Sequence, residues 1–163
     1  VACAVVLGVT FARYVTVVQG QGSGDVAAVA LGLTGDSTAD LTSQLQGMKP
    51  GESRTVNFAV TNTVDKTTSE VAQNYSVSIE TTRNLPLKFE LTAITPGVDK
   101  GEVATGSGSP WTGGDLPYGS DVTHSYTLTV TWPENASDSA LAYEIDRVVL
   151  KVDAQQAKPT EVL

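Results

Sequence analysis

Two chemically reactive side chains occur only once each, the histidine His124 and the cysteine Cys3. Single residues of these types provide no disulfide framework, no cysteine zinc site and no multi-histidine metal site within the chain. His124 has the inward parity of an alternating segment, where we expect a hydrogen-bonded core residue rather than a ligand. Cys3 lies in an apolar segment and is expected to act as a small hydrophobe, with an intermolecular disulfide as the alternative. The sequence therefore predicts no enzyme activity, no cofactor and no metal site.

A stretch rich in Gly and Pro, 106–121, holds the other side chains whose types suggest binding. Trp111 and Tyr118 are aromatic and are predicted to lie on a loop, where they could stack on a sugar or contact a neighbouring filament. The alternative is that this loop packs back over the end of the domain. Asp115 and Asp121 offer hard oxygen ligands of the kind that Ca²⁺ prefers. No Ca²⁺-loop signature surrounds them, so we expect solvated turn residues.

Asparagine and carboxylate side chains are the remaining candidates. Asn74 and Asn135 each begin an Asn-x-Ser triplet, the acceptor pattern for N-glycosylation, and Asn135 is the better candidate because it is predicted to lie in a loop. The acids Glu80, Glu90 and Asp153 occupy outward strand positions, with no apolar pocket expected around them to raise a pKa. No catalytic carboxylate pair is therefore predicted.

The length, net charge and composition of the chain indicate its class of fold and exclude some partners. The chain has 163 residues, which fits one domain of ordinary size. Its net charge is −8, the wrong sign for a phosphate-binding surface, so nucleic acid is not expected as a partner. Charged residues make up only 17% of the chain, and the rest of its polar content is mostly Thr, Ser, Gly, Asn and Gln. This composition favours sheets and turns.

Several segments show the two-residue hydrophobic period of half-buried strands. They are 53–62, 74–82, 87–94, 122–132 and 145–154, with a further strand expected at 25–33. The segment 34–46 reads as a polar stretch, 106–121 as a loop, and 135–143 as one or two helical turns. Thr61 and Val149 are predicted to face outward. The pattern indicates an all-β fold, an antiparallel β-sandwich of the jelly-roll or immunoglobulin-like kind.

The first eighteen residues are apolar, and Arg13 is their only charge. The uncharged part, 1–12, would rise only about 18 Å as a helix against a hydrocarbon core of roughly 30 Å, so no stable membrane span is expected. The end of a signal peptide, cleaved after Thr10-Phe11-Ala12, is one alternative. We expect instead that the segment belongs to the mature protein. Its many β-branched residues favour a strand.

This N-terminal strand is apolar on both faces and must be covered on both. Left free, it would be an exposed edge, whereas insertion into a neighbouring subunit would satisfy its backbone and both faces. A strand buried within its own sandwich is the alternative. The predicted organisation is a donor strand at 1–18, a flexible linker at 19–24 and a β-sandwich at 25–163. The predicted donor residues are Val5, Val6, Leu7, Val9, Phe11, Tyr14, Val15 and Val17.

Several short stretches together resemble secreted proteins of the TasA/camelysin type. They are Ala-Arg-Tyr-Val at 12–15, Lys-Pro-Gly-Glu at 49–52, Val-Thr-Asn at 60–62, Tyr-Ser-Val-Ser-Ile-Glu-Thr-Thr at 75–82, Asn-Leu-Pro-Leu at 84–87, Tyr-Thr-Leu-Thr-Val-Thr-Trp-Pro at 126–133, Glu-Ile-Asp at 144–146 and Ala-Gln at 154–155. The resemblance implies a jelly-roll subunit of extracellular matrix fibres, similar to archaeal bundling pili joined by donor strands. Some members were described as metalloproteases, but the chain has no His-Glu-x-x-His pattern, so that activity is not expected. The apolar run extends further before Arg13 than that type leads us to expect.

Together these features predict the structural subunit of a secreted filament at the cell surface, a pilus or biofilm matrix fibre. Its partners would be identical subunits in a head-to-tail homopolymer, with neighbouring filaments or surface polysaccharide as further contacts. The alternative is a secreted adhesion module that contacts polysaccharide through Trp111 and Tyr118.

Overall fold

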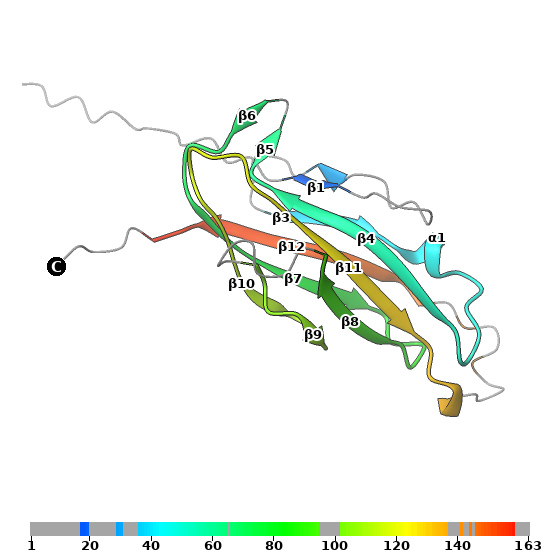
Figure 1. Cartoon of the computed structure of the whole chain (residues 1–163). Coiled ribbons are helices and arrows are strands. Elements are labelled where there is room, and N and C mark those ends of the chain that lie inside the picture. Colours follow the sequence, from blue (N-terminus) through cyan, green and yellow to red (C-terminus); the bar gives the residue numbers. More distant parts are fainter. Residues whose placement is uncertain are drawn as a thin grey trace, which may run out of the picture.

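The computed structural model describes residues 17–19, 29–30, 36–64, 66–94, 102–136, 141, 144 and 146–158, and these form an all-β fold with antiparallel pairing (Figure 1). One sheet has the strand order β2-β1-β4-β11-β8-β9 and the other β10-β7-β12-β3, while β5 and β6 pair by themselves. The strands are β1 Val17–Gln19, β2 Val29–Ala30, β3 Asp36–Asp40, β4 Ser53–Thr61, β5 Thr63–Val64, β6 Thr67–Thr68, β7 Gln73–Thr81, β8 Lys88–Ala93, β9 Gly106–Ser107, β10 Trp111–Leu116, β11 Thr123–Thr131 and β12 Val148–Gln156. Two short helices are α1, Thr42–Leu45, and the 3₁₀ turn η1, Glu134–Ala136.

Strands β4 and β11 form the longest continuous ladder of the six-stranded sheet. Thr61 pairs with Thr123 at one end and Ser53 pairs with Thr131 at the other, without a register shift. The alternation predicted for both strands is confirmed, because the inward residues are buried between the sheets. Phe58 and Tyr126 stack there, with ring centroids 5.4 Å apart. The largest fully buried side chains are Tyr126, Phe58, Leu41, Leu91, Leu116, Leu128, Leu150, Gln73, Val56, Val60 and Val77.

The two ends of this ladder define two ends of the molecule, called here the Thr61 end and the Trp132 end. The β5–β6 hairpin lies at the Thr61 end, and η1 lies at the Trp132 end (Figure 1). Because a strand rises about 3.3 Å per residue, the two ends of β4 lie about 26 Å apart. Trp132 is fixed by backbone hydrogen bonds with the Pro50-Gly51 turn: its N–H donates to Glu52 O at 2.9 Å, and its carbonyl accepts from Gly51 N at 2.8 Å.

At the Thr61 end, the buried side chain of Asn62 ties two segments together. Its amide donates to the carbonyls of Pro117 at 2.7 Å and Ser120 at 2.9 Å, while its Oδ1 accepts from the N–H of Val122 at 2.9 Å. Asn62 is fully buried, so these bonds satisfy a polar group that would otherwise destabilise the fold. They hold the chain that enters β11 against the end of β4.

The predicted loop at 106–121 is wrong in part, since it contains the strands β9 and β10. Strand β10 forms the edge of the four-stranded sheet and pairs with β7, with a register shift between Trp111 and Gly114. Trp111, Gly114 and Leu116 are buried, while the residues between them are exposed. This irregularity interrupts the two-residue period, so the hydrophobic pattern did not reveal a strand.

The polar stretch at 34–46 also contains a strand that was not predicted. Strand β3 pairs with β12 and forms the other edge of the four-stranded sheet. Ser37 and Ala39 are buried, but they are too small and too polar to give a hydrophobic signal. Of the strand predicted at 25–33, only Val29–Ala30 lies among the described residues, where it is β2. Of the helical turns predicted at 135–143, η1 covers the beginning, one residue earlier than expected.

Two residues predicted to face outward are buried. The Thr61 hydroxyl donates to Val122 O at 2.9 Å, within the closure of that end of the sandwich. Val149 lies on the central strand β12, between β3 and β7. Both positions are buried although alternation alone predicts that they are exposed.

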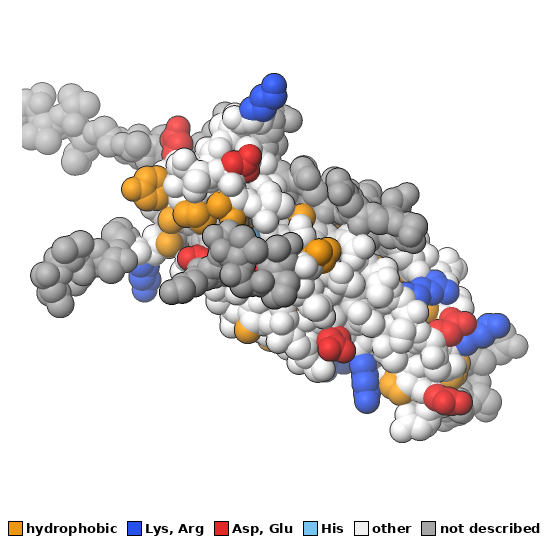
Figure 2. Space-filling view, in the orientation of Figure 1, with side chains coloured by type: hydrophobic (Ala, Val, Ile, Leu, Met, Phe, Trp, Pro, Cys, Tyr) orange, Lys and Arg blue, Asp and Glu red, His pale blue; other side chains and the backbone are white. Residues whose placement is uncertain are grey.

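Few charges lie on the described part of the face that Figure 2 shows. Most of that part is white, the colour of uncharged polar side chains and backbone, with Lys, Arg, Asp and Glu scattered over it. Among the described residues, no helix is long and apolar enough to cross a membrane.

Gly114 provides a first test of the packing between β10 and β7. A Cβ at this position would overlap the ring of Tyr75, whose hydroxyl is held by hydrogen bonds to His124 and Tyr126. Because the ring is anchored, we expect Gly114→Ala to lower the free energy of unfolding by about 1–3 kcal/mol. Urea denaturation measures this, with the exposed Thr112→Ala on the same strand as the matched control. Equal stabilities of the two variants would contradict the close contact.

Candidate functional site

A pocket of about 250 Å³ opens between the sheets at the Trp132 end. Its apolar walls come from α1 and the residues after it, from the connection between β7 and β8, and from the residue after β11. These apolar residues are Leu45, Met48, Leu85, Leu87, Trp132 and Leu141, and the polar lining adds Gln46, Gly47, Glu144 and Asp146. Elements connected to both sheets end around this pocket, and their side chains leave the core open there.

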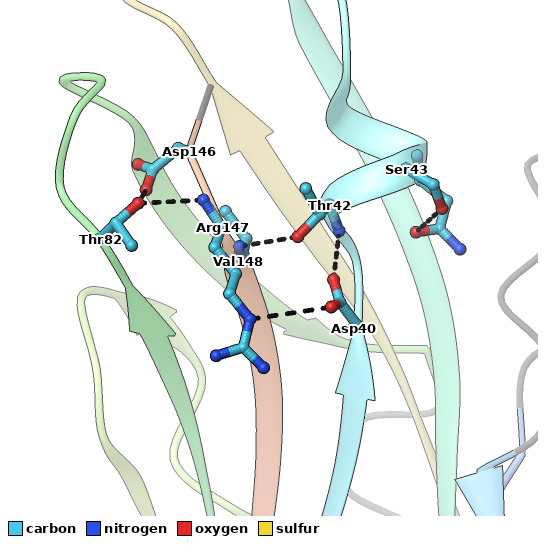
Figure 3. Close-up of polar contacts among 8 residues, drawn as sticks. Asp40, Thr42, Ser43, Thr82, Asp146, Arg147 and Val148 are labelled. Carbon is cyan, nitrogen blue, oxygen red and sulfur yellow. Dashed lines mark hydrogen bonds and ion pairs between the residues drawn. The ribbon is translucent and has the colours of Figure 1, made fainter. Parts of the chain in front are cut away.

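A chain of polar contacts holds α1 and the start of β12 beside the pocket (Figure 3). Asp40 Oδ1 accepts from the N–H of Thr42 at 2.9 Å, and the Thr42 hydroxyl accepts from the N–H of Val148 at 3.2 Å. Hydrogen bonds from Thr42, together with the Arg147 guanidinium 3.8 Å away, lower the pKa of Asp40 below its usual value. These contacts fix the backbone on which the acidic side of the pocket is built.

Asp146 is the buried carboxylate of the pocket, with 5% of its surface exposed. Its Oδ1 accepts from the hydroxyl of Thr82 at 2.5 Å (Figure 3). The same oxygen accepts from the hydroxyl of Thr81 at 2.6 Å and from the N–H of Arg83 at 3.0 Å. The Thr82 hydroxyl in turn accepts from the N–H of Arg147 at 3.0 Å. Oδ2 is buried and has no hydrogen-bond partner among the described residues. A buried carboxylate oxygen without a donor destabilises the fold, so a donor that reached this atom would stabilise it.

The charges of the pocket all have one sign. Asp146 and the exposed Glu144 are its two carboxylates, and no Lys or Arg is among the described residues that line it. Apolar walls with a buried acceptor and a second acid at the rim suit an apolar group that carries a positive charge or an N–H donor.

His124 lies in a second buried polar group, between the two sheets. Its Nδ1 is 2.7 Å from the hydroxyl of Tyr75, which is 2.5 Å from the hydroxyl of Tyr126, and Tyr126 accepts from the N–H of Val103 at 3.2 Å. The expectation of a buried, hydrogen-bonded core histidine is confirmed, although its Nε2 has no partner in the part of the chain that the structure describes. Burial, followed by the nearby Tyr126, raises the pKa of Tyr75, and burial raises the pKa of Tyr126.

The two aromatic residues predicted to form a contact surface are not exposed together. Trp111 is only 4% exposed, and its Nε1 donates to Gly106 O at 2.9 Å, whereas Tyr118 is 69% exposed. Trp111 therefore offers no ring face for stacking. Asp115 and Asp121 are both exposed. Among the described residues, no group of three or more His, Cys, Asp or Glu side chains could hold a metal ion.

Both predicted glycosylation sites have exposed side chains. Asn74 lies in β7, where its neighbours across the sheet are Asp115 and Gln155. Asn135 lies in η1, at the Trp132 end. Asn135 is again the more accessible of the two, because its backbone is not part of a sheet, and its glycosylation stays a prediction.

Of the predicted donor residues, only Val17 lies among the described residues. It belongs to β1, where it pairs with Thr61 and with Ala30 of its own chain. This differs from the prediction, which assigned Val17 to a strand for a neighbour, and Gln19 of the predicted linker also lies in β1. The other predicted donor residues and Cys3 lie outside the described residues.

The buried carboxylate was missed at the sequence level, although a signal for it exists. Asp146 has the same parity as Val148, Leu150 and Val152, which alternate with the outward Val149 and so form the inward set of the strand predicted at 145–154. An acid that continues an inward-facing series indicates either a strand that begins later or a buried carboxylate with partners. Here both are true, because β12 begins at Val148 and Asp146 is buried.

No protein-family model, curated protein or solved structure was found to match the chain.

Removing the Asp146 side chain should destabilise the Trp132 end. Asp146→Ala leaves the hydroxyls of Thr81 and Thr82 without their acceptor, while the N–H of Arg83 keeps only the Thr81 hydroxyl, so we expect the free energy of unfolding to fall by about 2–4 kcal/mol. Asp146→Asn keeps an oxygen in the Oδ1 position and should cost much less. Urea denaturation compares them with Glu80→Ala, an exposed acid on the outer face of β7. A loss no larger for Asp146→Ala than for Glu80→Ala would show that these bonds contribute little.

The buried tyrosines should make stability fall at alkaline pH. Both phenols have a raised pKa in the folded chain, whereas in the unfolded chain they ionise near a pH of about 10. Their contribution is fully present below that pH, and above it stability should fall by up to about 1.4 kcal/mol per pH unit for each tyrosine. Urea midpoints measured between about pH 9 and pH 11 give the slope. Tyr126→Phe should reduce this slope, and Tyr118→Phe, which alters an exposed phenol, should leave it unchanged. An equal slope in all three proteins would contradict the assignment.

Proposed function

We propose that the protein is the structural subunit of an extracellular filament, joined head to tail by its apolar N-terminal segment. The observation that carries this proposal is the placement of two features at opposite ends of the sandwich. The chain enters the fold at the Thr61 end, and the apolar pocket opens at the Trp132 end.

The direction of β1 shows at which end of the sandwich the chain before Val17 joins the fold. β1 runs antiparallel to β4, so Val17 lies beside Thr61 and Gln19 beside Ala59. Residues before Val17 therefore join the fold at the Thr61 end. Because Val17 pairs within its own chain, the segment proposed to enter a neighbour is 1–16. A segment attached at one end and a receiving pocket at the other favour a heterologous contact, which repeats into an open chain of subunits.

The energetics of such a contact depend on apolar burial. The segment 1–16 contains one charge, and its strand would be apolar on both faces. Burying about 600 Å² of apolar surface would contribute on the order of 15 kcal/mol before the costs of association and ordering. Main-chain hydrogen bonds to the receiving sheet would add direction and register. The same burial would remove from water a segment that otherwise invites aggregation.

The finer features belong to the same proposal. They are a jelly-roll or immunoglobulin-like sandwich, secretion to the cell surface, and membership of the TasA/camelysin type. We propose a structural role rather than catalysis, with identical subunits as the principal partners. The adhesion alternative rested on paired aromatic rings, and the burial of Trp111 removes one of them from the surface.

Deleting residues 1–16 tests this proposal. The shortened chain, 17–163, keeps β1 and every other described strand, so we expect the same circular dichroism spectrum as the full chain. It should stay monomeric in sedimentation, whereas the full chain should form filaments with an axial repeat of one domain in electron micrographs.

The matched control is the full chain carrying Tyr118→Ala, which removes an aromatic side chain that is 69% exposed and should form normal filaments. Filaments of unchanged form from the chain 17–163 would rule out the donor segment. A full chain that stays monomeric at every concentration would rule out the filament itself.

A further inference from the structure

The strongest unexplained feature of the molecule is the free Oδ2 of Asp146. This oxygen belongs to a side chain that is more than nine-tenths buried and that lines the pocket at the Trp132 end. The other oxygen already has three donors, from Thr81, Thr82 and Arg83. The carboxylate is thus held in place by one oxygen, and the second lacks the donor that burial requires. Such an atom in an acidic, apolar pocket indicates a cationic or N–H-bearing occupant.

We infer that this occupant is Arg13 of a neighbouring copy of the chain. The inference rests on the proposed function and names the contact that the donor segment makes. Arg13 is the only charged residue in the first eighteen, and its sign is opposite to that of the two acids of the pocket, Asp146 and Glu144. A guanidinium donates through a planar fork of N–H groups that matches a carboxylate, and its apolar stem packs against aliphatic and aromatic walls.

The residues around Arg13 match the remaining walls. In an extended strand, Phe11, Arg13 and Val15 share one face, because side chains alternate. An arginine flanked on its own face by two apolar side chains fits a pocket that Asp146 shares with Leu85, Leu87 and Trp132. The positive charge of Arg13 therefore complements the acids of the pocket, and its apolar neighbours complement the apolar walls.

The Arg13 of the same chain does not reach this pocket. Val17 is fixed beside Thr61, and the ends of the β4–β11 ladder lie about 26 Å apart. The four residues back to Arg13 span at most about 14 Å even when fully extended. Asp146 and Trp132 lie at the far end of that ladder, so the arginine that pairs with Asp146 comes from another subunit.

The pair also sets the register of the inserted strand. A segment that is apolar on both faces slides easily, since neighbouring registers bury similar surface. One charge that is satisfied in a single position removes this ambiguity, because every other register leaves a guanidinium and a carboxylate buried without partners. The function of Asp146 is then to select one alignment of the neighbouring strand.

A double-mutant cycle on the full chain tests the contact. The variants are Arg13→Gln, Asp146→Asn and the two combined, and the measurement is the critical concentration for polymerisation by sedimentation. Each single change should raise that concentration by about tenfold or more, and the double variant should be little worse than either single variant. Asp146→Asn keeps the bonded oxygen, and thermal unfolding of the monomer checks that the fold is intact. Glu80→Gln, an exposed acid outside the pocket, is the matched control and should have no effect.

The outcomes separate this inference from the proposed function. If the wild-type chain does not polymerise at all, the proposed function fails. If it polymerises through residues 1–16 but the single variants keep the wild-type critical concentration, or their effects simply add, the contact between Arg13 and Asp146 is wrong while the filament stands.

Cross-linking provides an independent measurement in a chain that carries Cys3→Ser. Chains with Arg13→Cys, mixed with chains with Glu144→Cys, should form disulfide-linked dimers between the two kinds of chain after oxidation. A chain carrying both cysteines should form an intermolecular ladder. A bond within one chain, at concentrations too low for assembly, would overturn the assignment to a neighbouring subunit.

Discussion

The unbroken antiparallel pairing of β4 with β11 is the constraint on which the rest of the structure depends. With Thr61 opposite Thr123 and Ser53 opposite Thr131, it sends Phe58, Tyr126 and their neighbours into the core and leaves the threonines between them on the outer face. A slip of one residue would turn every one of these side chains to the wrong face. The same ladder separates the two ends of the sandwich. β1 and the hydrogen bonds of Asn62, called here the Asn62 closure, lie at the Thr61 end, and the pocket lies at the Trp132 end.

Strands with clear alternation could be predicted, because one face of each is buried against the other sheet. This holds for β4, β7, β8, β11 and β12, whose bounds differ from the predicted ones by only a few residues. Where the signal is weak, prediction fails for identifiable reasons. β10 has a register shift and two glycines, and β3 is an edge strand of small and polar residues. Both were read as irregular chain because their pairing partners, not their own hydrophobicity, make them strands.

The pocket was much less accessible to prediction than the sheets. Its walls come from α1, from the β7–β8 connection, from the end of β11 and from the chain before β12, segments that are distant in the sequence. Leu87 and Trp132 belong to the alternating segments 87–94 and 122–132, where they share the parity of the inward residues, but nothing in the local pattern shows that the core remains open between them. Asp146 continues the inward parity of β12, yet its burial depends on the hydroxyls of Thr81 and Thr82 across the sheet. Tertiary packing, rather than local propensity, creates this site.

The Asn62 closure gives the sandwich different chemistry at its two ends. At one end a single amide side chain bonds to the carbonyls of Pro117 and Ser120 and to the N–H of Val122, and so satisfies the backbone there internally. At the other end a carboxylate oxygen is still short of a donor. The polar groups bound by Asn62 are satisfied at the Thr61 end, whereas Asp146 Oδ2 lacks a donor at the Trp132 end, so the two ends of the subunit are chemically different. In the proposed filament, each internal Asp146 site would be completed by the neighbouring subunit and one terminal site would stay vacant, so growth and capping would be controlled from one end.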